Sequence, residues 1–561
     1  MVDKREEEEN HEQEESAEPD PEERQEVAGA SVSASTDTPL QRGIKGYHNV
    51  MNSAIKRVYG ALFRQGLSAL QADSIDGVGI SVGSACSGTD IAMVVLSALL
   101  AIFASSMGGL EVQVNHTCAC EKDEAKRRFL MANFNPLYLF SNVSDLSSRA
   151  ATNVINGARV YIPYVSLFTA GFSCKSRSSL NCNSPRNVNC VQRGDMSEET
   201  TFTFMHIYYY VRRVRPRIVI LENVKQILAT IDQDSISDAA WIIEQLTAIG
   251  YHMSNFVFDC CDFGSIAARK RIYMIVWSLE FPTRMPGRLT LPTPNPLAWC
   301  NTFLDNFTIM PFQVSDFIIF DIKKLMGMNS RFTDVKELQD TSSGAKASGL
   351  SSSTKWCDEH IDVVRALGLP WPVSIPNASL DENSMMTVKL TDHVPFIFWR
   401  ACLHDRNAEL AYILMVKFPY KKSDVPEFVD TNPSFSRLCS GDAEDSPWRT
   451  TVPTITGQSK IVIRYMVGSD VILRPLLGVE VLSVVGWDYS SWKTHGELFP
   501  DPLMINLGGN AFSAFAFAPM LMTAVAGQGI IEDCVLEALV SAARGTADCE
   551  DGHGDSGSIS S

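Results

Sequence analysis

The sequence predicts an α/β fold, in which a mostly parallel sheet forms the first domain and the second domain is irregular. Between residues 77 and 280, short apolar runs alternate with amphipathic segments. This alternation is typical of a parallel sheet that carries helices on both faces and binds ligands beyond the carboxyl ends of its strands. After residue 280 the alternation stops, and stretches rich in Pro, Ser and Asn interrupt irregular apolar patches. The pattern therefore leaves the fold of the second domain undefined.

The elements of the first domain follow from their apolar runs. The expected strands cover residues 78–85, 112–119, 165–168, 218–221, 256–258 and 272–277, and the expected helices cover residues 91–103, 123–131, 203–214 and 239–249. The longest apolar run, residues 91–104, is too short to cross a bilayer core of ~30 Å. We expect it to be a buried helix, and we expect no membrane contact.

The two ends of the chain differ from the middle in composition. Residues 1–45 are acidic and then rich in Ser, Thr and Ala, which predicts a disordered tail. Residues 46–76 carry apolar side chains at helical spacing and predict a leading helix, and residues 541–561 predict a second disordered tail. Residues 1–26 hold −10 and residues 545–561 hold −4 of the net charge of −17. The rest of the chain is nearly neutral, so a polyanionic partner is not excluded.

The cysteines indicate free thiols. The chain has 14 cysteines, no paired Cys-x-x-Cys spacing and no N-terminal apolar signal stretch. This usage is typical of a reducing compartment and argues against a disulfide scaffold or a metal site.

The first two expected strands end in residues suited to a cofactor. "SACSGTD", residues 84–90, places a glycine turn between strand and helix, and Glu121 in "CACEKDE" follows the second strand. Amides at such a turn approach a ligand, and an acid at the second position accepts hydrogen bonds from ribose hydroxyls. We expect an adenosine-containing cofactor, whose adenine amino group Asp145 could meet after the third strand. The alternatives are a structural tight turn and helix caps at both acids.

The fourth and fifth strands end in a thiol and a carboxylate. Cys174 follows the fourth strand in "GFSCKS", Glu222 ends the fifth in "LENV", and "AARKRIY", residues 267–273, adds basic residues before a later strand. A thiol nucleophile needs positive charge nearby to ionise and an acid near its target. The alternative for Cys174 is a buried core cysteine.

In this order the segments resemble the cytosine-5 DNA methyltransferase family. "SACSGTD" is similar to its cofactor loop, "GFSCKS" to the loop with the catalytic cysteine, "LENV" to its Glu-Asn-Val motif and "DFGSIAARKRIYMI" to the segment with the pattern Gln-x-Arg-x-Arg. Downstream, "RPLLGVEVLSVVGWD" is similar to the stretch that supports the target-recognition domain, and "INLGGNAFSAFAFAPML" to the last motif. The resemblance implies a Rossmann-like methyltransferase domain over residues 77–280, a target-recognition region over 281–470 and a C-terminal segment over 471–540 that returns to the catalytic domain.

The resemblance also implies a chemistry. Cys174 would add to carbon 6 of a cytosine flipped out of DNA, while Glu222 hydrogen-bonds the ring nitrogen and amino group. Arg269 and Arg271 would hold the base, the carboxylate or a phosphate. The methyl group would come from S-adenosylmethionine, and the residues implied for that cofactor are Cys86, Ser87, Gly88, Glu121, Asp145 and Asn510.

Two stretches of the recognition region place basic residues beside aromatic ones. They are "WRACLHDRN", residues 399–407, and "KFPYKK", residues 417–422. This composition suits contacts to phosphates and bases, and it equally suits an ordinary solvated surface.

Four positions depart from the family pattern. Ser173 replaces a proline and Lys175 a glutamine beside Cys174, Ala267 replaces the first glutamine of Gln-x-Arg-x-Arg, and Asp90 replaces the second glycine of the cofactor loop. We expect Ser173 to loosen its loop and Lys175 to add positive charge beside the thiol. Asp90 would either meet the amino group of the cofactor or crowd it.

Two other functions remain open. One is an RNA cytosine-5 methyltransferase, although the Cys-Phe-Thr signature of the tRNA-acting branch does not occur in the sequence, which favours DNA. The other is a catalytically inactive nucleic-acid-binding or adaptor protein whose acidic tail recruits unknown partners. A nuclear location is expected from the DNA substrate alone.

Overall fold

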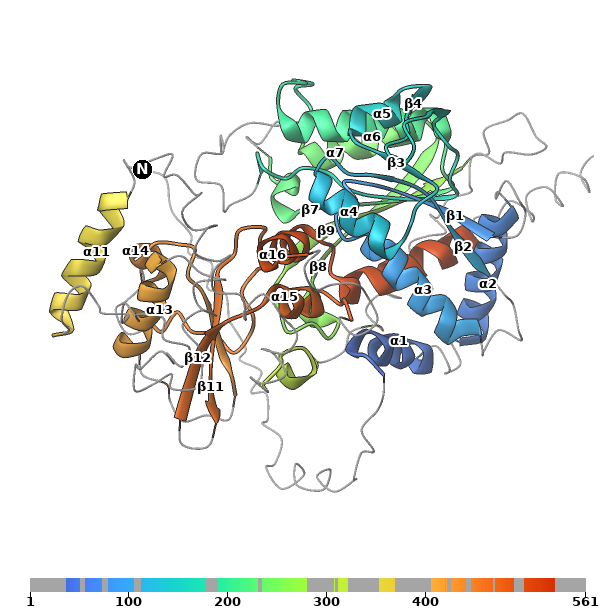
Figure 1. The fold of residues 1–561 in the computed structure, drawn as a ribbon. Helices are drawn as coiled ribbons and strands as arrows, with labels where there is room; N and C mark the ends of the chain where they lie inside the picture. The colour runs from blue at the N-terminus through green and yellow to red at the C-terminus, as the bar shows by residue number, and fades with distance from the viewer. Residues whose placement is uncertain are drawn as a thin grey trace, which may run out of the picture. The chain divides into compact units, whose positions relative to one another are not determined.

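The computed structural model describes most of the first domain and parts of the second (Figure 1). The described residues are 37–50, 56–72, 79–104, 112–177, 190–230, 235–279, 307, 311–320, 353–368, 405–418, 420, 425–439, 445–467, 470–488 and 499–529. The main sheet has the strand order β3-β2-β1-β6-β7-β9-β8. Its strands are β1 (Gly79–Ala85), β2 (Gln113–Cys120), β3 (Tyr138–Phe140), β6 (Leu167–Gly171), β7 (Ile218–Val224), β8 (Tyr251–Asp259) and β9 (Lys270–Ser278).

Most neighbours in this sheet are parallel. Strands β3, β2, β1, β6 and β7 pair in parallel, whereas β9 runs antiparallel to both β7 and β8. The chain moves outward from β1 to β2 and β3 and then returns to place β6 beside β1. This reversal creates a switch point between β1 and β6, where open α/β sheets bind their ligands. The predicted mostly parallel, Rossmann-like α/β fold is confirmed.

Both faces of the sheet are buried, which explains the continuous apolar runs of its strands. In β7, Ile218 and Ile220 belong to one core cluster, and Val219 and Leu221 belong to the other. Successive side chains of a strand point to opposite faces, so a strand covered on both sides needs apolar residues at every position.

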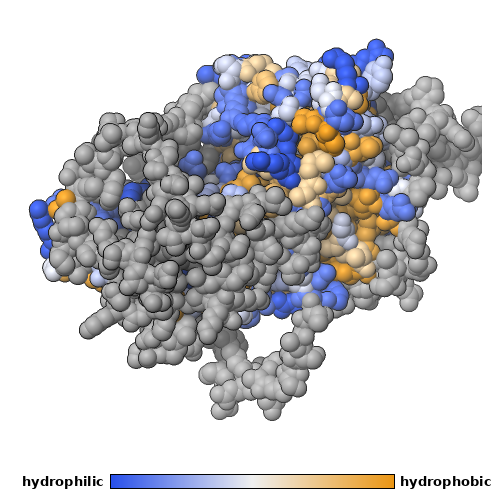
Figure 2. Space-filling view, viewed as in Figure 1, coloured by the Kyte–Doolittle hydropathy of each residue, from blue (hydrophilic) through white to orange (hydrophobic). Residues whose placement is uncertain are grey.

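Helices cover these faces. They are α3 (Ile91–Ala104), α4 (Glu124–Asn133), α5 (Val143–Ser147), α6 (Glu199–Val214) and α7 (Asp238–Ala248). Figure 1 shows α6 and α7 on one face and α3 on the other. Hydrophilic residues gather over α4 in Figure 2, in agreement with its narrow buried side of Phe129 and Leu130.

The first described helix begins earlier in the chain than the sequence pattern predicted. Helix α1 (Pro39–Val50) precedes α2 (Lys56–Ala72), so the prediction of a disordered tail over residues 1–45 is wrong at its end. Thr38 and Gln41 form reciprocal hydrogen bonds between side chain and backbone amide, and Leu40 and Ile44 are buried. A capping box with proline in the first turn therefore starts the helix. Residues 1–36 lie outside the described residues.

The C-terminal segment packs against the main sheet. It contains α15 (Gly478–Val484), α16 (Asp501–Asn510) and a helix over residues 514–529. Trp277 of β9 donates its indole N–H to the carbonyl of Ala524 at 2.8 Å. The stretch Asp501–Gly529 is long and apolar enough to cross a membrane, but 89% of its most apolar window is buried within the protein. Such burial is what a core helix requires. The predicted tail over residues 541–561 lies outside the described residues.

The second region contains a small antiparallel sheet. Its strands are β10 (Glu427–Asp430), β11 (Ile461–Val467) and β12 (Asp470–Pro475), and its described helices are α11 (Ser353–Ala366), α13 (Asp405–Lys417) and α14 (Phe435–Leu438). Strands β11 and β12 pair directly, with Val467 opposite Asp470. The expected boundary at residue 470 therefore falls inside a hairpin, and β12 belongs with the strands before it.

Candidate active site

The loop that carries Cys174 begins where β6 ends and is held at several backbone groups. The amide of Asn223 on β7 donates to the carbonyl of Phe172 at 3.1 Å. The carbonyl of Cys174 accepts from the N–H of Arg177 at 3.0 Å, which closes a tight turn. Cys174 itself is half-buried. The turn thus lifts the thiol out of the core at the carboxyl edge of the sheet.

The two departures beside Cys174 form new contacts. The N–H of Ser173, which a proline would lack, donates to the hydroxyl of Thr203 on α6 at 3.0 Å. The ammonium of Lys175 pairs with Glu199 at 2.5 Å, and Glu199 also pairs with Lys122 at 2.6 Å. The hydrogen bond of Ser173 offsets the loss of the proline ring, and the expectation that serine loosens the loop stays a prediction. The charge of Lys175 is offset by Glu199.

The pKa of the Cys174 thiol is raised above its usual value. Burial is the main cause and the negative charge of Glu222 adds to it, while Arg271 and Arg269 act in the opposite direction. The thiol is therefore protonated in the ligand-free protein at neutral pH. Its ionisation depends on the charge state of Glu222.

Glu222 lies near the carboxyl end of β7, opposite Gly171 at the end of β6, and it lies against a cation from β9. The antiparallel register places Arg271 opposite Val224, and the Arg271 guanidinium lies 3.1 Å from a Glu222 carboxylate oxygen. Burial raises the pKa of Glu222, and Arg271 and Arg269 oppose this shift. A carboxyl group with a raised pKa can hold a proton and donate a hydrogen bond near neutral pH.

Arg269 is buried and binds backbone carbonyls from two distant segments. Its guanidinium donates to the carbonyls of Ile455 at 2.8 Å, Gly509 at 3.1 Å and Ala511 at 2.8 Å. These contacts tie the C-terminal segment to the end of β9. Arg269 is thus placed as a positioning residue, whereas Arg271 lies at the carboxylate.

Ala267 lies at the position of the family's glutamine. The polar contacts that the structure describes for it are made by its backbone. It forms a β-bridge with Val452, and its carbonyl accepts from the thiols of Cys260 and Cys261 at 2.8 and 3.1 Å. The main chain, rather than a side-chain amide, fixes this segment against the second region.

The loop after β1 has an unusual backbone. Cys86, Gly88 and Asp90 all have positive φ, at 54°, 49° and 48°. Non-glycine residues rarely adopt this conformation, so the surroundings must stabilise it. Glu121 does so by accepting from the N–H of Gly88 and, with its other oxygen, from the N–H of Asp123, both at 3.0 Å.

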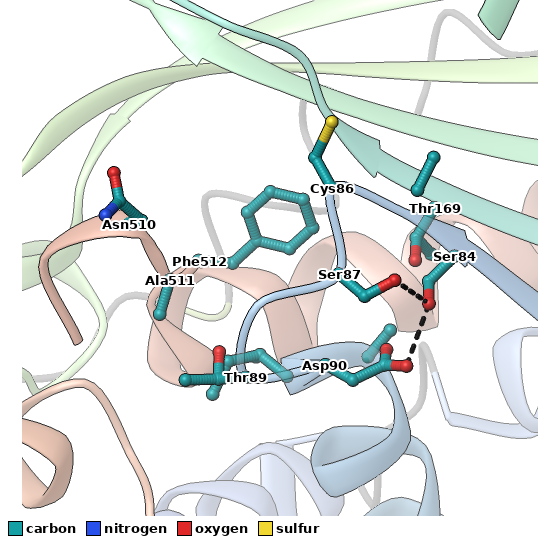
Figure 3. Close-up of a pocket in the computed structure, with 12 residues that line it drawn as sticks. Ser84, Cys86, Ser87, Thr89, Asp90, Thr169, Asn510, Ala511 and Phe512 are labelled. Carbon is teal, nitrogen blue, oxygen red and sulfur yellow. Dashed lines mark hydrogen bonds between the residues drawn. The ribbon is translucent and has the colours of Figure 1, made fainter. Parts of the chain in front are cut away.

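The Asp90 carboxylate lies beneath the loop. It accepts from the Ser84 hydroxyl at 2.8 Å and lies 2.9 Å from Nε2 of His116 on β2. Figure 3 shows the contact of Asp90 with Ser84, which also contacts Ser87. Asp90 thus links its strained loop to the neighbouring strand. It also lines the pocket described next, so both expectations for this residue stay predictions.

A pocket opens at the switch point between β1 and β6, with about 280 Å³ of empty space. Its lining residues are Ser84, Ala85, Cys86, Ser87, Thr89, Asp90, Ile91, Ala92, Thr169, Asn510, Ala511 and Phe512. Three predicted cofactor residues, Cys86, Ser87 and Asn510, therefore meet in one cavity (Figure 3). Burial raises the pKa of Cys86 to about 12, so this thiol is a neutral part of the lining.

The other predicted cofactor residues are placed differently. Gly88 is part of the loop and donates its N–H to Glu121. Neither residue lines the pocket. Asp145 accepts from the N–H of Asn142 at 3.0 Å as part of the capping box of α5. The contact of Asp145 in the structure is thus that of a helix cap, which was the alternative interpretation of this residue.

Thr169 and Phe512 are among the lining residues that sequence reasoning did not name as site residues. Thr169 lies on β6 opposite Ser84 of β1, and Phe512 follows Asn510 in the stretch that resembles the last family motif. Hydroxyls, an amide and an aromatic ring in one cavity suit a ligand that combines polar groups with a heterocycle. Among the described residues, no group of three or more His, Cys, Asp or Glu could hold a metal ion.

In the described parts of the basic and aromatic stretches of the second region, the basic side chains contact other residues of the protein. Arg406 donates to the carbonyls of Asn432 and Pro433, and the ammonium of Lys417 lies 4.9 Å from the ring centre of Phe435. Residues 399–404 and 421–422 lie outside the described residues. The described part supports packing roles for these side chains.

Comparison with known proteins agrees with this geometry. Residues 100–360 match the family model of the C-5 cytosine-specific DNA methylases, and this range contains Cys174, Glu222, Arg269 and Arg271. A curated relative from Cryptococcus neoformans var. grubii, DNA (cytosine-5-)-methyltransferase DMT5, is 29% identical over 203 residues. The match covers 36% of this chain and only 8% of that relative.

Two solved methyltransferase structures show a distant similarity to this chain. EhMeth of Entamoeba histolytica is 10% identical with a TM-score of 0.38, over 80% of this chain and 98% of its own. The Dnmt2 methyltransferase of S. pombe is 11% identical with a TM-score of 0.38, over 79% of this chain and 97% of its own. From the family model and the curated relative, we conclude that residues 100–360 are similar to the C-5 cytosine-specific DNA methylases.

Proposed function

We propose that this protein transfers a methyl group from S-adenosylmethionine to carbon 5 of cytosine in DNA. The observation that carries this proposal is the shared edge of β6 and β7. Cys174 and Glu222 leave these neighbouring parallel strands at their carboxyl ends, and Arg271 pairs with Glu222. The pocket after β1 lies one strand away.

The side chains have complementary tasks in this reaction. Carbon 5 of cytosine is a poor nucleophile, and addition of the Cys174 thiolate to carbon 6 makes it an enamine carbon. A protonated Glu222 donates a hydrogen bond to the ring nitrogen as negative charge develops there. Protonation of Glu222 also removes a charge that raises the Cys174 pKa, so the acid and the thiolate favour each other. After methyl transfer a base removes the carbon-5 proton, and the thiol leaves.

The cytosine must leave the duplex to reach Cys174, because the thiol lies at the edge of a sheet and carbon 6 is stacked within DNA. Arg271 at the same edge can hold the base or a neighbouring phosphate in addition to Glu222.

S-adenosylmethionine supplies an electrophilic methyl group when bound. Ser87, Thr89, Thr169 and Asn510 offer polar contacts to such a ligand, and Phe512 offers an aromatic face. Glu121 holds the loop after β1 by accepting from the N–H of Gly88. These features support the choice of cofactor.

A transfer assay tests the function and its RNA alternative together. Purified protein with methyl-labelled S-adenosylmethionine should label duplex DNA, and tRNA transcripts should remain unlabelled. Cys174→Ser should abolish labelling while cofactor affinity stays nearly intact. Cys439→Ser is the matched control, because Cys439 is also half-buried but lies in the second region.

Two outcomes would contradict the proposal. Labelling of RNA alone would mean that the protein performs the same chemistry on an RNA substrate. Cofactor binding without labelling of any nucleic acid would favour a non-catalytic adaptor. The nuclear location that we propose with a DNA substrate is tested by fluorescence microscopy of the tagged full chain.

A further inference from the structure

A buried carboxylate joins the two ends of the segment that follows Cys174. Asp238, with no exposed surface, accepts from Nε and Nη2 of Arg177 at 2.8 and 2.7 Å. It also accepts from the backbone amides of Cys190 and Val191 at 3.1 Å and of Gln192 at 3.2 Å. One carboxylate therefore receives five hydrogen bonds from both sides of residues 178–189.

The first turn of α7 makes Asp238 available for this task. Ser237 is the N-cap and accepts from the N–H of Ala240 at 3.1 Å. Since Ser237 caps the helix, the Asp238 side chain can point to Arg177. The helix N-terminus, three amides and a guanidinium together offset a charge that burial alone would make very costly.

These contacts reach the nucleophile through a short path. Arg177 follows Cys174 by three residues, and its N–H donates to the carbonyl of Cys174. Movement of the turn would withdraw Arg177 and leave the Asp238 charge buried without its cation. The ion pair thus fixes the position of the turn through its buried side. Thr203 and Glu199 of α6 bind the same turn through Ser173 and Lys175.

We propose that Arg177 and Asp238 form a positioning pair that holds Cys174 in its reactive place, a role that rests on the proposed function. Neither residue lines the pocket. The pair acts on the rate of thiol addition and leaves cofactor binding unaffected.

The test compares single-turnover methylation by Asp238→Asn and by the control Glu480→Gln. Glu480 is also fully buried and accepts from Arg474 and from two backbone amides, but it lies in the C-terminal segment. Both variants should melt at lower temperature. Per folded enzyme, Asp238→Asn should react at least about tenfold more slowly with unchanged affinity for S-adenosylmethionine, a loss equal to about 1.4 kcal/mol of barrier.

The double variant Arg177→Gln with Asp238→Asn removes both charges and should recover part of this rate. Equal rates for Asp238→Asn, Glu480→Gln and wild type, after correction for the folded fraction, would overturn the positioning role.

A readout independent of methylation separates this proposal from the proposed function. If wild-type protein labels no nucleic acid, the function fails. Alkylation of Cys174 by iodoacetamide, measured on its peptide by mass spectrometry, still tests the pair. Asp238→Asn should change that rate at least about threefold relative to Glu480→Gln, and an unchanged rate would overturn the pair as well.

Discussion

Cys174 and Glu222 show how a single charge sets the reactivity of a neighbouring residue. The thiol has a raised pKa in the free protein because of its burial and the Glu222 charge, while Arg271, Arg269 and a backbone hydrogen bond oppose this shift. The Cys174 thiol is therefore protonated at neutral pH while Glu222 carries its charge, and burial acts in the same direction. A resting thiol of this kind is protected from oxidation and alkylation.

The first prediction follows from the sign of this effect. Glu222→Gln removes the negative charge that raises the Cys174 pKa, so the pKa should fall and the thiolate fraction at pH 8 should rise. Alkylation of the Cys174 peptide by iodoacetamide should then be faster by about threefold or more, since each pKa unit changes that fraction up to about tenfold, although methylation is lost. Slower alkylation in this variant would show that Glu222 is uncharged in the free protein.

The second prediction concerns Ser173. Thr203→Val should leave the Ser173 N–H without its acceptor and lower the free energy of unfolding by about 1–3 kcal/mol. Thr203→Ser retains the hydroxyl and should stay close to wild type. Urea unfolding of the three proteins measures the difference, and equal midpoints for Val and Ser would mean that this hydrogen bond does not hold the loop.

At the scale of elements, the sequence predicted best where one physical rule acted alone. Strands β1, β2, β7 and β9 are buried on both faces, so their apolar runs gave their positions within a few residues. Strand β8 was predicted too short, as residues 256–258. It is an edge strand with half-buried His252 and Ser254 on one side, and these polar residues masked the pattern.

Two element signals were present but were not used. "TPLQ" at residues 38–41 has the spacing of a capping box with proline in the first turn, and it starts α1. "IVIRYMV" and "DVILRP" are separated by Gly-Ser in the sequence, a hairpin pattern, and they form β11 and β12. The rest of the second region has no comparable periodicity.

The third prediction tests the start of α1. Deletion of residues 1–36 should leave the melting temperature unchanged. Deletion of residues 1–45 also removes Leu40 and Ile44, which are 6% and 0% exposed, and burial of each contributes about 1.5–3 kcal/mol. The longer deletion should therefore melt at a clearly lower temperature, and equal melting of both proteins would show that α1 adds no stability.

At the scale of the whole molecule, the pocket after β1 is completed by residues more than 300 positions away from its loop. Arg269 holds the carbonyls of Gly509 and Ala511, which flank Asn510, and it also holds Ile455. No local pattern reveals such a contact. The family resemblance implied that Arg269, like Arg271, holds the base, the carboxylate or a phosphate. Three carbonyl contacts place it at the junction of the chain's segments.

The fourth prediction follows from this junction. Arg269→Lys keeps the charge but cannot donate to three carbonyls in one plane. The Asn510 side of the pocket should loosen, and the dissociation constant for S-adenosylmethionine should rise about tenfold, as measured by calorimetry. Cofactor affinity equal to that of wild type would show that this junction does not support the pocket.

The central claim is that Cys174 attacks a cytosine in DNA, and a trapping reaction tests it most directly. Duplex DNA with 5-fluorocytosine is incubated with the protein and S-adenosylmethionine, and the complex is denatured, digested and mapped by mass spectrometry. Fluorine cannot leave as the proton does, so the account predicts a covalent DNA adduct on Cys174 that Cys174→Ser abolishes. The absence of an adduct while the cofactor is bound, or attachment at another residue, would contradict it.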